Sequence, residues 1–204
     1  MGTLIETKNP KVTYDEFLAS VDEDVRAEWV DGEVISMSPV TDRHQEIAKF
    51  LIVLLELYLG ANPVGKLLQE YTVKLGPNLP ARVPDLIFLF NENAARNRGT
   101  YVDGPVDIAI EIVSLDSRGR DRGEKFYEYE QAGVREYWMI DPLRSQADFS
   151  LLGDDGKYGP ASLTGGIFQS IVLAGLRINP GWFWLYPLPK VTSVLKDAGI
   201  SPIL

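Results

Sequence analysis

Length and composition place the chain among single-domain globular proteins, since 204 residues can bury a substantial core and 45% hydrophobic with 24% charged residues is typical of a folded chain. The absence of Cys and the single His exclude disulfides, thiolate catalysis and zinc sites built from Cys or several His. A net charge of -9 repels polyanions at long range, so a nucleic-acid partner would need a local basic surface or a bound cation.

Neither a membrane span nor an export signal is expected. The longest apolar run, Phe50–Leu55, is far shorter than the roughly 20 residues that cross a bilayer. No basic stretch followed by an apolar one opens the chain, as it would in a signal peptide. We therefore expect a cytoplasmic protein with no membrane partner.

A short helix and a β-hairpin are the first elements expected in chain order. Thr13 and Glu16 have the spacing of a capping box at the start of a helix. Apolar residues then flank Asp31-Gly32, a dipeptide typical of a two-residue hairpin turn. The sequence thus predicts a hairpin between residues 28–30 and 33–35.

A long amphipathic helix and three strands come next. Residues 42–59 repeat apolar positions with the period of an α-helix, which Gly60 and Pro63 should end. The three strands are predicted over 67–75, 85–90 and 106–113. The last two are almost continuously apolar, as strands covered on both faces are, and the polar stretch 91–104 between them is predicted to be a loop.

The second half of the chain adds a helix, a strand and a strand-rich tail. These elements are predicted over 121–132, 136–141, 149–152 and 167–173, followed by an aromatic segment over 182–186. The order of helix, three strands, helix and strand predicts the α/β (α+β) class. We expect a mixed sheet with an αβββαβ core flanked by helices, plus the N-terminal hairpin and C-terminal strands.

Two carboxylates interrupt strands that are otherwise apolar. Asp85 opens the strand DLIFLF, and Glu111 lies inside AIEIV. A buried ionised carboxylate is costly unless it is paired or binds a metal. If the two strands are neighbours, both side chains meet near the strand ends, where a divalent cation such as Mg²⁺ or Mn²⁺ would relieve their repulsion. The structural alternative is that Asp85 caps its strand and Glu111 pairs with Arg82.

Lys125 is the third candidate for the same site. It shares a helix face with Asp121 and Tyr129, four residues away on either side. Because this helix follows the strand of Glu111, a lysine in its first turns could hold a water or phosphate oxygen beside a metal. The alternative is a solvated pair with Asp121, worth about 0.3–0.5 kcal/mol.

Further candidates surround these three residues. The loop before the second helix holds the densest basic cluster of the chain: Arg118, Arg120 and Arg122. A phosphate-binding surface and a solvated loop are both open for it. His44 lies on the apolar side of its helix, either as a core histidine or at the edge of a site. The aromatic segment 182–186 is interpreted as core or an oligomer contact rather than a base-stacking platform.

These motifs, taken in order, resemble the Uma2 family, also called DUF820, within the PD-(D/E)XK nuclease superfamily. They are Asp31-Gly32-Glu33, His44, Val83-Pro84-Asp85, Glu111-Ile112-Val113-Ser114, Lys125 with Tyr129, and Gly133-Val134-Arg135-Glu136-Tyr137-Trp138 with Asp141-Pro142. The resemblance covers residues 12–186 of one domain over 1–204, with a tail over 187–204. The superfamily lysine two residues after the Glu is replaced by Val113, and the Uma2-like pattern places it on the following helix, at Lys125.

The resemblance implies a restriction-endonuclease-like fold and a Mg²⁺-dependent (or Mn²⁺-dependent) phosphodiesterase, a DNA endonuclease that acts as a homodimer. Asp85 and Glu111 would bind the cation together with the Ile112 carbonyl, and Lys125 would orient the attacking water. The candidate substrate-binding residues are His44 and Tyr129, at the edge of this site, and Arg118, Arg120 and Arg122 of the basic cluster.

Two other functions remain open at this point. The acidic charge and the displaced lysine would suit a catalytically inactive binding or assembly module on the same fold. The acidic charge would also suit a metal-dependent hydrolase of a small phosphorylated substrate better than an enzyme for long DNA.

Overall fold

A six-stranded mixed sheet forms the centre of the computed structural model, which describes residues 11–20, 27–36, 41–114 and 123–201. Its strands, in spatial order, are β11 (Tyr158–Pro160), β10 (Gln146–Leu152), β9 (Glu136–Asp141), β8 (Ile108–Ile112), β6 (Leu86–Phe90) and β3 (Gly65–Gln69). Strands β8 and β9 are parallel, and the other neighbours are antiparallel. With helices α2 and α4, the chain order α2-β3-β6-β8-α4-β9 confirms the expected αβββαβ core.

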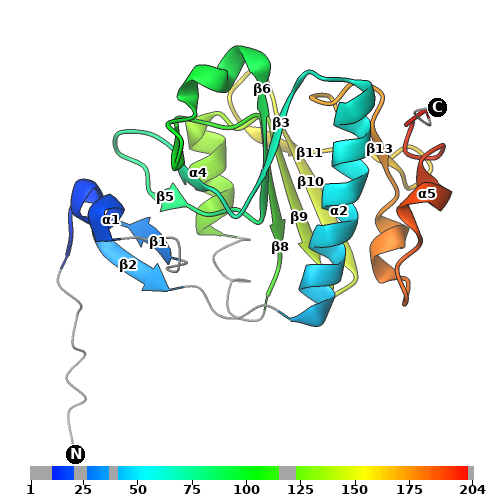
Figure 1. Ribbon diagram of the computed structural model, residues 1–204, viewed down its shortest axis with the longest axis horizontal. Coiled ribbons are helices and arrows are strands. Elements are labelled where there is room, and N and C mark those ends of the chain that lie inside the picture. The colour runs from blue at the N-terminus through cyan, green and yellow to red at the C-terminus, as the bar shows by residue number, and fades with distance from the viewer. Residues whose placement is uncertain (1–10, 21–26, 37–40, 115–122, 202–204) are drawn as a thin grey trace, which may run out of the picture.

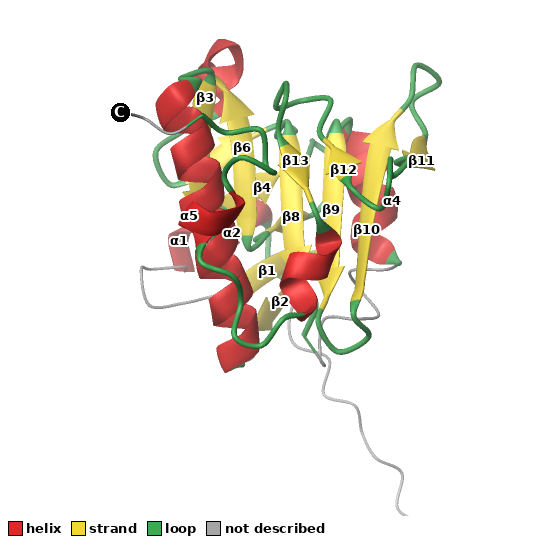
Figure 2. Cartoon of the chain, turned by 90° about the vertical axis from the view of Figure 1, so that its right-hand side faces the viewer, coloured by secondary structure: helices red, strands yellow, loops and turns green. Residues whose placement is uncertain are grey.

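Two helices cover opposite faces of this sheet (Figure 1). Helix α2 (Asp42–Ala61) lies on one face together with the short α5 (Val191–Val194), and α4 (Glu124–Ala132) lies on the other (Figure 2). The Thr41 side chain caps α2 by accepting a hydrogen bond from the backbone N–H of His44. The helix passes through Gly60 and ends two residues later than predicted.

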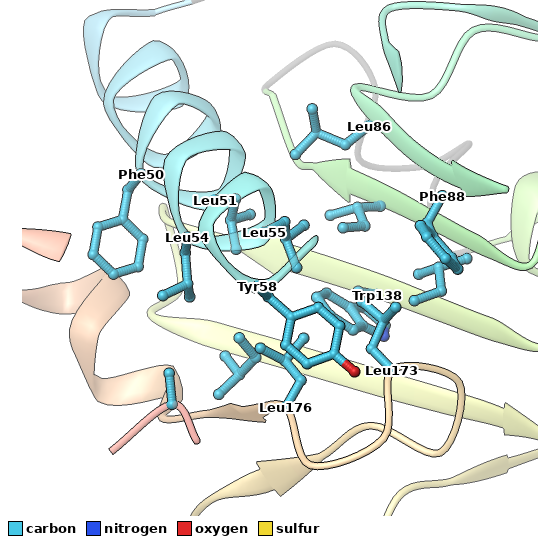
Figure 3. Close-up of a cluster of buried hydrophobic side chains, with 14 of the residues drawn as sticks. Phe50, Leu51, Leu54, Leu55, Tyr58, Leu86, Phe88, Trp138, Leu173 and Leu176 are labelled. Atoms are coloured by element: carbon cyan, nitrogen blue, oxygen red, sulfur yellow. The ribbon is translucent and has the colours of Figure 1, made fainter. Parts of the chain in front are cut away.

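The larger apolar cluster lies between α2 and the sheet. Figure 3 shows Leu51, Leu55 and Tyr58 projecting from α2 toward the strands, where Trp138 of β9 is fully buried. Burying each such side chain contributes about 1.5–3 kcal/mol. A second cluster under α4 includes Tyr129, so β6 and β8 are covered on both faces, as their apolar sequences predict.

A second, smaller sheet lies on the α4 side of the first (Figure 1). Its strands, in spatial order, are β2 (Glu33–Ser36), β1 (Ala27–Val30), β5 (Ala81–Arg82), β4 (Thr72–Lys74) and β7 (Tyr101–Asp103). The predicted hairpin is confirmed: Val30 faces Glu33, and Asp31 and Gly32 have the positive φ values of 49° and 87° that a two-residue turn needs. Helix α1 (Tyr14–Ser20) begins with the predicted capping box, in which Glu16 accepts the Thr13 N–H at 2.7 Å.

Two predictions between α2 and β8 are wrong. The single strand expected over 67–75 is divided at Glu70, whose φ of 49° turns the chain, so that β3 joins the large sheet and β4 the small one. The expected loop over 91–104 contains the 3-10 helix η1 (Asn91–Arg96) and β7. Strand β7 forms because it pairs in parallel with β4.

The C-terminal part also departs from its predicted outline. The strand expected over 167–173 is reduced to β12 (Phe168–Gln169), which pairs with β13 (Arg177–Ile178). The chain turns away after β12 because the Glu136 carboxylate accepts the N–H groups of the next turn. The 3-10 helix η2 (Pro180–Trp184) follows, with Trp182 in the core, whereas Tyr186 is 84% exposed.

Helix α4 is described from Glu124 onward, and Gly133 ends it as predicted, with a φ of 87°.

Across the described ranges of the chain, we find no helix with the length and apolar character that crossing a membrane requires.

Candidate functional site

Asp85 lies directly before β6, beside the end of the neighbouring strand β8. Since Leu86 pairs with Ile110, Asp85 lies level with Glu111 of the neighbouring β8. The Asp85 Oδ2 accepts the backbone N–H of Ile112 at 2.6 Å, and its Oδ1 lies 2.9 Å from the His44 Nε2. This carboxylate is therefore buried between the start of α2 and the end of β8.

Glu111 is held from the side of α4. Its Oε1 lies 3.0 Å from the Lys125 Nζ and accepts the Tyr129 hydroxyl at 2.9 Å. Burial, and then the charge of Glu111, raise the pKa of Tyr129 well above its ordinary value, so the phenol stays neutral and donates. The i, i+4 spacing on α4 thus brings both donors to one carboxylate oxygen.

Lys125 contacts a second carboxylate, which the sequence analysis did not single out. Its Nζ lies 3.1 Å from the Oε1 of Glu28, a buried residue of β1. The other oxygen of Glu28 accepts from Arg82 Nη1 at 3.0 Å. Burial alone would raise the pKa of Glu28, but the charges of Lys125 and Arg82 outweigh it and lower the pKa.

Arg82 extends this series of charges. It lies on β5 with 0% exposure and donates to both oxygens of Glu128 at 2.7 Å. Five side chains of alternating sign, here termed the ion chain, therefore run from α4 through the small sheet to the candidate site: Glu128, Arg82, Glu28, Lys125 and Glu111. The alternation gives each buried charge a partner of opposite sign.

These contacts decide between several alternatives of the sequence analysis. Lys125 is 2% exposed, so the interpretation as a solvated surface residue is wrong. Arg82 was the alternative ion-pair partner predicted for Glu111, but it donates hydrogen bonds to Glu28 and Glu128. His44 contacts Asp85 and is buried, so it belongs to the site.

Two groups of contacts lie where the start of β6 meets the end of β8: Asp85 with Ile112 and His44, and Glu111 with Lys125 and Tyr129. Arg118, Arg120 and Arg122, together with Asp121, lie outside the described residues. Glu28 was missed, although an isolated arginine in the stretch ARV, at residues 81–83, was a signal that a buried carboxylate had to be nearby.

The donor set of the site fits a hard divalent cation. Within the described ranges no group of three or more His, Cys, Asp or Glu side chains is placed to hold a metal ion. A cation would therefore take Asp85, Glu111 and backbone or water oxygens, which is the kind of ligand set that Mg²⁺ accepts. The Ile112 N–H faces Asp85 while the next N–H faces β9, so the Ile112 carbonyl also lies on the Asp85 side of β8.

Comparisons with known proteins give a family and a similar structure. The sequence profile of the Uma2 family, described as "Putative restriction endonuclease", matches residues 14–180. A crystal structure of a "putative nuclease belonging to DUF820" from Anabaena variabilis is similar with a TM-score of 0.70 and 16% identity, over 85% of this chain and 97% of that chain. No curated protein matches the chain. At 16% identity this structural similarity bears on the fold alone, and it confirms the predicted restriction-endonuclease-like fold.

Proposed function

Because the chain belongs to the Uma2 family, we propose that it is a metal-dependent nuclease that hydrolyses phosphodiester bonds of DNA. One observation carries the proposal: two buried carboxylates of adjacent strands, Asp85 and Glu111, lie level with each other, and an ammonium group contacts one of them. Neighbouring carboxylates away from water are costly unless a cation offsets their charge.

Asp85, Glu111 and the Ile112 carbonyl would hold the ion, Mg²⁺ or Mn²⁺. Such an ion, when bound, supplies Lewis-acid activation of the phosphate and of the attacking water. The His44 ring orients Asp85 through the contact at 2.9 Å, and the Tyr129 hydroxyl orients Glu111. Contacts of this kind fix the direction of the carboxylate oxygens before substrate arrives.

Lys125 supplies positive charge at the reacting phosphate. Val113, in the position of the usual superfamily lysine, is 1% exposed and belongs to the apolar cluster under α4. The ammonium instead reaches Glu111 from α4. A fixed cation at this place stabilises the negative charge that develops on the phosphate oxygens.

Cleavage of supercoiled plasmid in Mn²⁺ or Mg²⁺ tests the proposal. Asp85→Asn keeps the size of the side chain and removes its charge, so we expect a loss of about 100-fold or more, since metal ions contribute several kcal/mol and 1.36 kcal/mol is tenfold. Asp154→Asn, at an exposed position, is the matched control and should cleave like the wild type. Equal cleavage by wild type and Asp85→Asn would refute the proposal.

A homodimer is the second part of the proposal, because a twofold pair of sites suits the cleavage of both strands of a duplex. Light scattering at the assay concentration should report twice the chain mass of 22.7 kDa. A monomer under those conditions would contradict it.

The net charge of -9 favours a second candidate function, hydrolysis of a small phosphorylated substrate at the same site. The salt dependence of substrate binding separates the two functions. Duplex DNA binding weakens steeply with salt, because each neutralised phosphate releases counterions, whereas a small substrate gives a shallow dependence.

A further inference from the structure

We propose that Glu28 is a positioning residue for Lys125, which keeps the ammonium at the site when Glu111 takes up a cation. The inference rests on the proposed function of Asp85 and Glu111 as cation ligands. It assigns a role to the small sheet, from which Glu28 comes.

The position of the Lys125 ammonium is the starting point. Its Nζ lies between two carboxylates, 3.0 Å from Glu111 and 3.1 Å from Glu28, in a place that is 2% exposed. A divalent cation on Glu111 would offset the charge of that carboxylate and repel the ammonium. Glu28 is then a carboxylate that still attracts Lys125 at 3.1 Å, and such an ion pair offsets the cost of burying the ammonium.

Glu28 is itself fixed, as a positioning residue must be. It is 2% exposed, and Arg82 Nη1 holds its second oxygen at 3.0 Å. Arg82 is in turn held by both oxygens of Glu128. The Glu28 carboxylate therefore has one oxygen for the lysine and one for the arginine, and stays charged.

The pairing of β1 with β5 explains how this arrangement is built. Trp29 of β1 faces Ala81 of β5. Because the two strands are antiparallel, Glu28, which precedes Trp29, lies opposite Arg82, which follows Ala81. One strand contact thus sets the acidic and the basic side chain beside each other under α4. A lysine on α4 reaches Glu111 with a flexible stem of four carbons, so a second anchor restricts where its ammonium can lie.

Mn²⁺ titration calorimetry on four proteins tests the inference: wild type, Glu28→Gln, Lys125→Met and the double variant. With Lys125 present, Glu28→Gln should weaken Mn²⁺ binding about tenfold, the size expected for directly contacting residues. With Lys125→Met, the same substitution should change the affinity less than about threefold, because the effect acts through the lysine. Equal effects in both backgrounds would overturn the inference.

The wild-type titration separates this inference from the proposed function. If the wild type binds Mn²⁺ but Glu28→Gln has equal effects in both backgrounds, only the positioning role is refuted. Wild type that binds no Mn²⁺ refutes the cation site and the positioning role together. Glu33→Gln, at an exposed position of the same hairpin, is the matched control and should leave the affinity unchanged.

Two further measurements distinguish the positioning role from a folding defect and from a merely structural role. If Glu28→Gln does not fold, the cycle is run with Glu28→Asp, which keeps the charge on a shorter side chain, and a smaller effect of the same sign is expected. In cleavage assays, folded Glu28 variants should lower kcat with KM for DNA unchanged, since Lys125 acts on the developing charge. A raised KM with unchanged kcat would overturn the inference.

Discussion

Replacement of Arg82 by Met measures how much the ion chain stabilises the fold. Methionine keeps an unbranched apolar side chain but removes the guanidinium, which is 0% exposed and contacts Glu28 at 3.0 Å and Glu128 at 2.7 Å. The substitution therefore leaves Glu28 with Lys125 as its counter-charge, and leaves Glu128 without its arginine.

The structure sets the expected magnitude. Removing one partner of a buried ion pair costs about 3–5 kcal/mol, because a buried charge is left uncompensated. The lower end applies here, since Glu28 keeps Lys125 and the Glu128 side chain, 17% exposed, can turn toward water. A loss of about 3 kcal/mol corresponds to a fall in Tm of about 6–12 °C for a chain of this size.

The pH dependence of that loss distinguishes charge from packing. Burial acts to raise the pKa of Glu28, but Lys125 and Arg82 lower it below the ordinary 4.5. A carboxylate with a lowered pKa stabilises the fold above its unfolded pKa, and this stabilisation is lost as the pH falls through the folded pKa. Arg82→Met removes part of it, so its cost should be largest near neutral pH and should shrink below 4.5.

Urea unfolding of wild type and Arg82→Met at about pH 7 and about pH 3.5 checks this expectation. Leu54→Ala, in the apolar cluster under α2, is the control, with a loss of about 2–5 kcal/mol that does not depend on pH. A loss below about 1 kcal/mol at neutral pH, or an equal loss at both pH values, would show that the ion chain does not stabilise the fold in the way described.

Two further substitutions test the ends of α4 and of β12. Glu136→Gln replaces a carboxylate that accepts the Trp138 Nε1–H and two backbone N–H groups, so at least one buried donor loses its acceptor, and we expect a loss of about 1–3 kcal/mol in urea unfolding. Exposed Glu56→Gln is the comparison, and equal midpoints would contradict the expectation. Gly133→Ala should cost about 1 kcal/mol from its φ of 87° alone, because a Cβ there meets no atom within 4 Å. An unchanged midpoint would show that this conformation is not required.

The order of the central elements could be predicted because each has a local signal. Strand β9 has its predicted bounds, Glu136–Asp141, and the two most apolar stretches, β6 and β8, are buried on both faces as predicted. The division of 67–75 could not be predicted, since both halves are extended and their pattern does not say which sheet each joins. Likewise, β7 forms because it pairs in parallel with β4, which is distant in sequence, so no local signal predicts it.

The candidate site was predictable only where a residue type conflicts with its surroundings. Asp85 and Glu111 stand out as carboxylates in apolar strands, whereas Lys125 has the spacing of an ordinary exposed helix pair. Glu28 lies in a strand of four residues with the burial order buried, buried, intermediate, intermediate. A strand of four residues is too short to show a periodic pattern of apolar residues, so the sequence could not indicate that the Glu28 side chain is buried.

The ion chain also bears on when the site forms during folding. Its contacts join residues far apart in sequence, with separations of 54 for Arg82 to Glu28 and 46 for Arg82 to Glu128. Closing such long loops costs entropy before any contact is gained, so we expect these pairs to be absent from the folding transition state. Arg82→Met would then accelerate unfolding and leave the refolding rate unchanged. A chain that has already assembled the strands of its large sheet would thus still lack the ion chain beside the candidate site.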